Sequence, residues 1–146
     1  MKIKDIKTAI NGVITVNGGT VYSSETKEGY EKPAYFTNVI PLRVTRISNV
    51  YDEVELDVEI HYESSSATEE ECIITEDLIN RWFAEPINVG DRVIKPPEEI
   101  QHTIDDSAVL YSDFTLITTV IHNEDAYITD LPEMENLEFN LIKKEG

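Results

Sequence analysis

The alternation of apolar and polar residues is most regular from residue 54 to residue 62. Every second side chain there is apolar, and the positions between them carry three acids and one histidine. Successive side chains of a β-strand point to opposite faces, so one face of this strand meets a core and the other meets water or a partner. Asn49 and Asp52 predict a hairpin tip just before it. The apolar positions are Val54, Leu56, Val58, Ile60 and Tyr62.

The N-terminal segment has helical spacing instead. Apolar residues recur there every three or four positions, with polar residues between them, which predicts a short amphipathic helix. We expect this helix to end around Asn11 and Gly12 or one turn later, because the β-branched run that follows leaves its C-terminal end open. Its apolar positions are Ile3, Ile6, Ile10, Val13 and Ile14.

A second helix is predicted in the middle of the chain. Thr68 and Glu71 have the spacing of a capping box, and the run of three acids that ends at Glu71 favours a helix N-terminus through the helix dipole. We expect the helix to run to about Phe83 or Ala84, with Pro86 stopping it. Its predicted apolar face carries Ile74, Leu78, Ile79 and Trp82.

Runs of β-branched and aromatic residues between turn-forming residues predict further strands. Together with the helices they predict an α+β fold in a single domain over residues 1–146, with a mostly antiparallel β-sheet and two α-helices packed on one face. Residues 130–146 are expected to form a C-terminal strand or arm, because the stretch from Met134 to Ile142 alternates. Asn88 to Asp91 is expected to be a turn. The other expected strands are Thr20–Tyr22, Ala34 to about Val44, Arg92–Ile94, Gln101–Asp105 and Ala108–His122.

Composition and charge limit the classes of protein to which this chain can belong. Its 146 residues are the size of one domain, and 40% of them are apolar, so most of the chain should fold around a core. The net charge of −17 argues against a protein whose main task is gripping nucleic-acid phosphates. No stretch predicts a membrane helix or a signal peptide. Cys72 is the single cysteine, which excludes an internal disulfide and fits a reducing, cytoplasmic origin.

The residues that could carry chemistry form no convincing constellation. The glycines match neither a phosphate loop nor a dinucleotide-binding pattern, so no catalytic residue, cofactor site or metal site is assigned. One alternative is a divalent-cation site built from Asp105, Asp106 and Asp113, although a polar turn before a strand also explains these acids. Cys72, near a helix start, is interpreted as structural. The three histidines are scattered: His61, His102 and His122. These patterns indicate a non-catalytic binding or assembly domain.

The segment KEGYEKPAYF, from Lys27 to Phe36, places a rigid turn directly before a strand. Gly29 can adopt the positive φ angles that other residues resist. Pro33 fixes its own φ and restricts Lys32 before it. Taken alone, the segment predicts a loop that leads the chain into the strand beginning at Ala34.

Several motifs, taken in order, resemble one known family. They are KTAIN (Lys7 to Asn11), VYSSETKEGYEKPAYF (Val21 to Phe36), IHY (Ile60 to Tyr62), LINRWF (Leu78 to Phe83) and PEMENLEFN (Pro132 to Asn140). Their order and spacing resemble the tail terminator family of phages and prophages of Gram-positive bacteria, including phage-like contractile particles. Glu28 stands where the family commonly has Gln, and Ala34 and Tyr35 replace the commoner Cys and Phe. The matching positions are Tyr22, Gly29, Pro33, Phe36, Met134, Glu135 and Leu137.

The resemblance implies a structural role without catalysis or cofactor. Members of the family resemble one another in an α+β fold and assemble as homo-hexameric rings on the last ring of the tail tube. There they end tube growth and provide the surface that joins the head or caps a headless particle. The implied partners are further copies of the chain, the tail tube protein, and the sheath and head-completion proteins. The implied location is the tail or neck of a virion or phage-like particle, assembled in the cytoplasm of the bacterial host.

Two expectations about surfaces follow from the implied ring. A share of the acids should line its pore, so that passing DNA is not held by its phosphates, and no membrane is involved. Two other functions stay open, a head-completion or connector adaptor of the neck and a small metal-binding module. The residues expected at the contact with a neighbouring subunit or the tube are Tyr22, Glu28, Gly29, Tyr30, Pro33, Met134 and Leu137.

Overall fold

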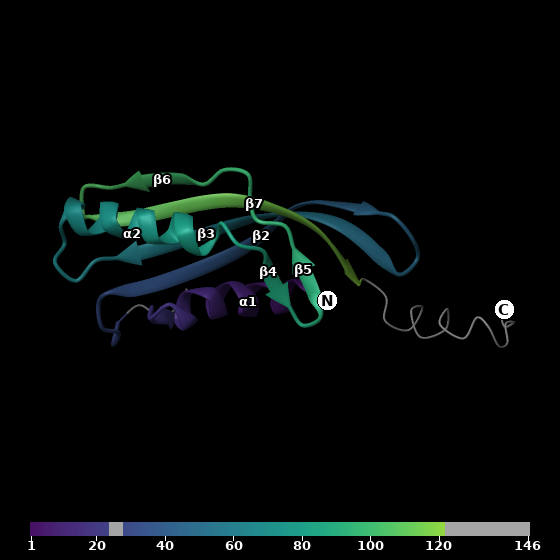
Figure 1. Ribbon diagram of the computed structural model, residues 1–146, viewed down its shortest axis with the longest axis horizontal. Helices are drawn as coiled ribbons and strands as arrows, with labels where there is room; N and C mark the ends of the chain where they lie inside the picture. Colours follow the sequence, from purple (N-terminus) through teal and green to yellow (C-terminus); the bar gives the residue numbers. More distant parts are fainter. Residues whose placement is uncertain (24–27, 122–146) are drawn as a thin grey trace, which may run out of the picture.

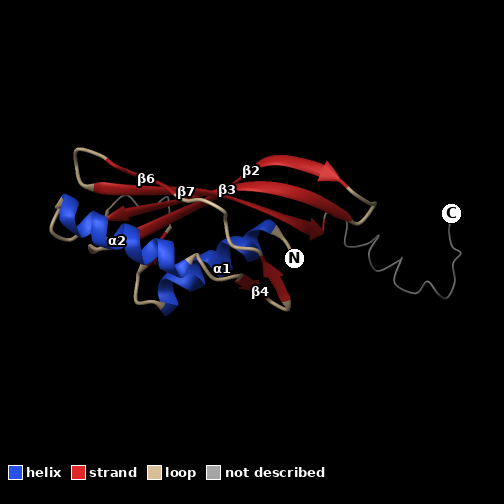
Figure 2. Ribbon diagram, turned by 45° about the horizontal axis from the view of Figure 1, so that its top comes forward, coloured by secondary structure: helices blue, strands red, loops and turns tan. Residues whose placement is uncertain are grey.

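The computed structural model describes residues 1–23 and 28–121, which form two α-helices and seven β-strands. Both helices lie on the same side of the main sheet (Figures 1 and 2). The α+β class predicted from the sequence is therefore confirmed, while the strand or arm predicted at Met134 to Ile142 lies outside the described residues. The elements are α1 (Ile3–Val16), β1 (Val21–Tyr22), β2 (Ala34–Arg46), β3 (Tyr51–Glu63), α2 (Glu69–Trp82), β4 (Ile87–Val89), β5 (Arg92–Ile94), β6 (Gln101–Ile104) and β7 (Val109–Ile121).

The main sheet has the strand order β1-β2-β3-β7-β6. Only β1 runs parallel to its neighbour, β2, and the other pairs in this sheet are antiparallel. β2 and β3 form a long hairpin whose register shifts between Pro41 and Arg43. β4 and β5 pair in a separate two-stranded sheet.

The core lies between the helices and the central strand β3. All five apolar positions of the alternating β3 pattern are buried, as predicted. In α1, Ile6, Ile10 and Ile14 are fully buried on one stripe, and each side chain contributes about 2 kcal/mol by leaving water. The sheet therefore has a face covered by the helices and an opposite face, which we call the open face.

The first helix ends at the later of the two predicted positions. α1 continues to Val16, one turn beyond Gly12. At its start, the Asp5 carboxylate accepts the backbone N–H of Lys2 at 2.8 Å. At its end, the side-chain amide of Asn17 donates to the Val13 carbonyl oxygen at 2.7 Å. These bonds satisfy polar groups that a helix terminus leaves unpaired.

The predicted cap of the second helix is confirmed in one half only. The Thr68 hydroxyl oxygen accepts the backbone N–H of Glu71 at 3.3 Å, which makes Thr68 the N-cap. The Glu71 carboxylate does not complete a capping box. It accepts the backbone N–H groups of Ser65 and Ser66 and the Tyr62 hydroxyl, so it ties the loop before the helix to β3.

The predicted apolar face of α2 is partly wrong. Ile79 is buried as predicted, but Ile74 is 57% exposed. The buried stripe runs instead through Cys72 and Thr75 to Ile79. Ile74 is two residues after Cys72 and therefore lies about 200° around the helix from it, facing solvent.

The turn predicted at Asn88 to Asp91 is wrong in its first half. Ile87 and Val89 are buried on one side of β4, and only Gly90 and Asp91 form the turn to β5. Gly90 has a φ of +63°, a conformation that suits glycine in a tight hairpin. A strand of three residues gives too short an alternation to be recognised in the sequence.

The β2–β3 hairpin extends beyond the helices at one end of the sheet (Figure 1). Residues 40–49 of this hairpin are all exposed, and we call them the hairpin arm. β2 continues to Arg46, slightly beyond the predicted limit near Val44. The arm thus continues the paired strands of the sheet into a region that the helices leave uncovered.

Candidate functional site

Three aromatic rings gather at one edge of the open face, which we call the aromatic corner. Tyr22 of β1 lies opposite Phe36 of β2, and Phe36 lies opposite His61 of β3. Tyr30 reaches both rings from the loop. The ring centroids are 5.5 Å apart for Tyr22 and Tyr30, 6.2 Å for Tyr22 and Phe36, and 5.2 Å for Tyr30 and Phe36. Such tilted and edge-to-face pairs stabilise the folded chain beyond what the burial of their surface contributes.

Polar contacts fix the loop on this corner. The Tyr30 hydroxyl donates to the Glu63 carboxylate at 2.8 Å, and Lys32 lies 3.7 Å from the same carboxylate. The hydrogen bond to Glu63 raises the pKa of Tyr30, because a phenolate there would face a negative charge. The backbone N–H of Glu31 donates to the Tyr22 hydroxyl oxygen at 3.3 Å. The two tyrosines predicted at an interface are therefore brought together.

The other predicted interface residues differ in how far the structure describes them. Gly29 has a φ of +84°, as its place in the turn predicted, and it is exposed together with Glu28. Pro33 is exposed and follows a cis peptide bond from Lys32. Residues 24–27 of the loop lie outside the described residues. Met134 and Leu137 also lie outside them, so the structure does not place these two predicted interface residues.

A column of acids runs along β3 on the open face. These positions alternate with the buried apolar residues of the same strand, and the pairing with β7 places neutral residues beside most of them. Arg43 of β2 lies opposite Glu55 and forms an ion pair with it at 2.9 Å. The column consists of Glu53, Glu55, Asp57 and Glu59.

One carboxyl group from β7 joins this column. Asp113 lies opposite Glu59 on β3 and opposite Gln101 on β6. Burial, and then the neighbouring Asp57 carboxyl, raise the pKa of Asp113 to about 7. Asp113 thus carries a proton over part of the neutral range, which reduces the repulsion within the column.

The structure separates the acids of the alternative cation site. Asp105 follows the end of β6, whereas Asp113 pairs with the first residue of that strand. The Asp105 carboxylate accepts the backbone N–H groups of Ser107 and Val109 and the Tyr111 hydroxyl. These bonds, the one from Val109 foremost, lower the pKa of Asp105. Within residues 1–23 and 28–121, no cluster of three or more His, Cys, Asp or Glu residues is arranged to hold a metal ion.

The remaining reactive side chains are held by neighbours. Cys72 is fully buried and donates to the Ala108 carbonyl oxygen at 3.2 Å, and burial raises the pKa of its thiol. His102 lies 2.8 Å from both the Ser112 hydroxyl and the Asn80 side-chain oxygen, and burial lowers its pKa. The structural interpretation of Cys72 therefore agrees with its surroundings. His61 packs edge-on against Tyr111, and His122 lies outside the described residues.

Comparison with known protein families gives a direct result. The family model described as "Phage tail terminator protein" matches residues 5–128. The chain belongs to the phage tail terminator family. This is a structural family of the phage tail, so the resemblance recognised in the sequence motifs is confirmed, and the protein has a structural role in a phage tail.

The other comparisons add little to this assignment. No curated protein matches the chain. Among the solved structures, one matching chain is 14% identical, with 84% of this chain and 97% of that chain covered and a TM-score of 0.42. A likeness this distant supports no argument. None of the described helices is both long and apolar enough to cross a membrane.

Proposed function

We propose that this tail terminator forms a hexameric ring on the last ring of the tail tube and ends tube polymerisation there. The ring also provides the surface that joins a head or caps a headless particle. The family match over residues 5–128 is the observation that carries the proposal. The partners are further copies of the chain and the tube protein, with the sheath and head-completion proteins adjacent. Assembly takes place in the cytoplasm of the bacterial host, and the mature location is the tail or neck.

The open face of the sheet suits the wall of a channel for DNA. Its acid column faces away from the core, and a negative wall does not retain phosphates as a basic wall would. In this proposal the open face lines the lumen of the ring, and the helices lie on its outer side.

The aromatic corner suits a contact with the tube or with a neighbouring subunit. Its rings and the Glu63 contacts hold the loop in one shape, so docking would order few additional side chains. Glu28 and Gly29 are exposed at the loop and free to be covered by a partner. Met134 and Leu137 belong to the same proposed interface on the sequence pattern alone.

Electron microscopy of particles assembled without this chain tests the proposed function. The expected result is tails of uncontrolled length that lack a neck, because nothing stops tube growth. Complementation with the full chain should restore one tail length. Tails of normal length without the chain would contradict the proposal, and binding of the chain to the portal side of a head would indicate a connector adaptor instead.

A second test addresses the lumen. Replacing Glu53 and Glu59 on the open face by lysine should make the assembled ring retain double-stranded DNA at low salt, and the retention should fall as salt is raised. The matched control replaces Glu70 and Glu85, which are exposed elsewhere, so that the net charge changes equally. Equal retention by the two variants would contradict the placement of the open face at the channel.

A further inference from the structure

The hairpin arm carries an unusual concentration of exposed apolar side chains. Four of them lie within eight residues of a chain whose net charge is −17. Single exposed apolar residues are ordinary, but several within one short exposed segment indicate a contact surface. The four are Ile40, Leu42, Val44 and Ile47, exposed by 42%, 57%, 52% and 56%.

These side chains lie on both faces of the arm. Ile40 is opposite Asp57, an open-face residue of β3, whereas Val44 is opposite Val54, which faces the helix side. The change of face follows from the register shift between Pro41 and Arg43. An arm that is apolar on both faces is better covered by a groove than by a flat surface. Pro41 and the register shift also prevent an unbroken hydrogen-bonded ladder along this edge, so side chains must provide most of the contact.

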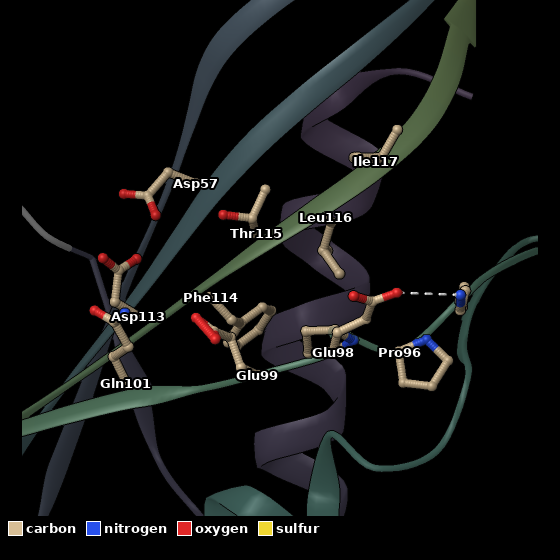
Figure 3. Close-up of a pocket in the computed structure, with 12 residues that line it drawn as sticks. Asp57, Pro96, Glu98, Glu99, Gln101, Asp113, Phe114, Thr115, Leu116 and Ile117 are labelled. Atoms are coloured by element: carbon tan, nitrogen blue, oxygen red, sulfur yellow. Dashed lines mark ion pairs between the residues drawn. The ribbon is translucent and has the colours of Figure 1, made fainter.

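A groove of suitable character lies at the other side of the sheet. β6 pairs with β7 only as far as Asp113, so within the described residues no strand of the sheet flanks β7 from Phe114 onwards on that side. The segment from Lys95 to Glu99 runs beside this part of β7 and leaves a cavity of about 530 Å³ (Figure 3). Its apolar lining comes from Pro96, Pro97, Phe114, Leu116 and Ile117.

The charges of the two surfaces are opposite. The groove is lined by Glu98 and Glu99, and the single lysine in its lining is Lys95, in a mostly exposed ion pair of 3.6 Å with Glu98. The arm carries Arg43 and Arg46, whose side chains are mostly exposed although each already pairs with a carboxylate of β3. The Arg43–Glu55 pair is the more exposed of the two, and exposed pairs are weak, so Arg43 can also contact a partner at little cost. The Asp52 side chain that pairs with Arg46 is only 7% exposed, so Arg46 stays with its carboxylate.

We propose that the hairpin arm of one copy inserts into the β7 groove of the next copy. The inference rests on the proposed ring and deepens it by naming the surfaces that join neighbouring subunits. The arm and the groove are different surfaces of one chain, so the contact is head-to-tail and can be repeated by every copy until the ring closes. Leu42 and Val44 fill the apolar lining, and Arg43 approaches the carboxylates of Glu98 and Glu99.

Disulfide trapping tests this contact. One variant of the full chain carries Leu42→Cys and another carries Ile117→Cys, and the native Cys72 is fully buried and does not interfere. Under mild oxidation, covalent dimers should form when the two variants are mixed and not with Leu42→Cys alone. A single chain with both substitutions should give a ladder of linked chains. The reaction is run on concentrated protein and on purified tails that carry the double variant.

The outcomes separate this inference from the proposed function. Linked chains in either sample support the contact. The arm-in-groove contact is overturned if neither sample shows linkage, or if Leu42→Cys alone links to itself. Either result leaves the terminator role standing, because that role is tested by the tail length of particles without the chain. Normal tail length in such particles would overturn the proposed function whatever the disulfides show.

A charge substitution provides the matched control. Leu42→Asp should lower the fraction of chain found in rings by about tenfold or more, since a carboxylate in the apolar groove is costly to desolvate. Ile74→Asp introduces the same side chain at a position with the same 57% exposure on α2, and it should leave the ring fraction nearly unchanged. Both variants should unfold thermally as the unmodified chain does. Equal loss of rings in the two variants, or no loss with Leu42→Asp, would overturn the inference.

Discussion

The two halves of β2 belong to one continuous strand but have opposite surroundings. In the first half, Tyr35 and Thr37 are buried on the helix side, where they lie opposite Tyr62 and Ile60 of β3. In the second half, every residue from Ile40 to Arg46 is exposed, although the strand remains paired with β3. The comparison shows that strand pairing and core formation are separate here. The covered half stabilises the fold, and the exposed half is available to a partner.

Removing a ring from the covered half should have the largest effect on stability. The Tyr35 ring packs against Tyr62 and Trp82, with centroids 4.8 Å and 6.0 Å away. Tyr35→Ala should lower the free energy of unfolding by about 3 kcal/mol, because it leaves a cavity in the core. Urea unfolding followed by circular dichroism measures the change. A loss below about 1 kcal/mol would show that this half is not part of the core.

A smaller loss of stability is expected when a side chain is added at Gly19, where α1 packs against the covered half of β2. A Cβ at Gly19 would lie 2.6 Å from Ile14 Cγ2 and 2.8 Å from Tyr35 Cε1, so Gly19→Ala should cost about 1–3 kcal/mol through overpacking. Gly12→Ala is the matched control, because its Cβ would meet no atom within 4 Å. In the interior of α1 it should instead add about 1 kcal/mol. Similar effects at both glycines would contradict this account of the packing.

The two faces of the sheet should respond oppositely to pH. The pKa of Asp113 on the open face is raised from 3.8 to about 7, so the folded state holds a proton that the unfolded state loses. Stability should therefore rise as pH falls from about 7 towards 4, and Asp113→Asn should remove this rise and increase Tm at pH 8. Thermal unfolding across this range measures it. An unchanged pH profile in Asp113→Asn would contradict the assignment.

Glu71, which ties α2 to β3, should show the reverse dependence. Hydrogen bonds from Ser66 and Tyr62 lower the pKa of Glu71 from 4.5 to about 2. A carboxylate with a lowered pKa stabilises the fold above its unfolded value, and that contribution is lost as pH falls from about 4.5 to about 2. Glu71→Gln should be less stable at neutral pH and should flatten the profile in this acidic window only. A loss that persists unchanged below pH 2 would point to packing rather than charge.

The smallest effect on stability is expected in the hairpin arm. Leu42→Ala removes an exposed side chain outside the core, so the free energy of unfolding should change by less than about 0.5 kcal/mol. Measured beside Tyr35→Ala, it compares the two halves of β2 directly. A loss similar to that of Tyr35→Ala would mean that the arm is covered within a single chain.

Most of the fold is predictable from the sequence because its long elements have strong periods. The alternation of β3 and the helical spacing around Ile6 and Ile10 identify these elements and the faces that they bury. The short β4 and the buried stripe of α2 are not predictable in this way. Three residues define no period, and Ile74 is as apolar as the residues that tertiary packing buries.

The candidate site is predictable only in part. The turn chemistry of Gly29 indicates the loop, but the pairing of β1 with β2, which brings Tyr22 to Phe36, depends on a strand of two residues. The exposure of the arm is also hidden in the sequence, because the apolar run around Leu42 is what a buried strand would show. The arm is uncovered because the hairpin extends beyond both helices, which is a feature of the tertiary structure (Figure 1).

Cryo-electron microscopy of purified tails that carry this chain tests the central claim most directly. The account predicts six copies encircling the end of the tube, with the column from Glu53 to Glu59 turned towards the central channel. Density for the chain elsewhere on the particle, or a ring in which these acids face outwards, would contradict it.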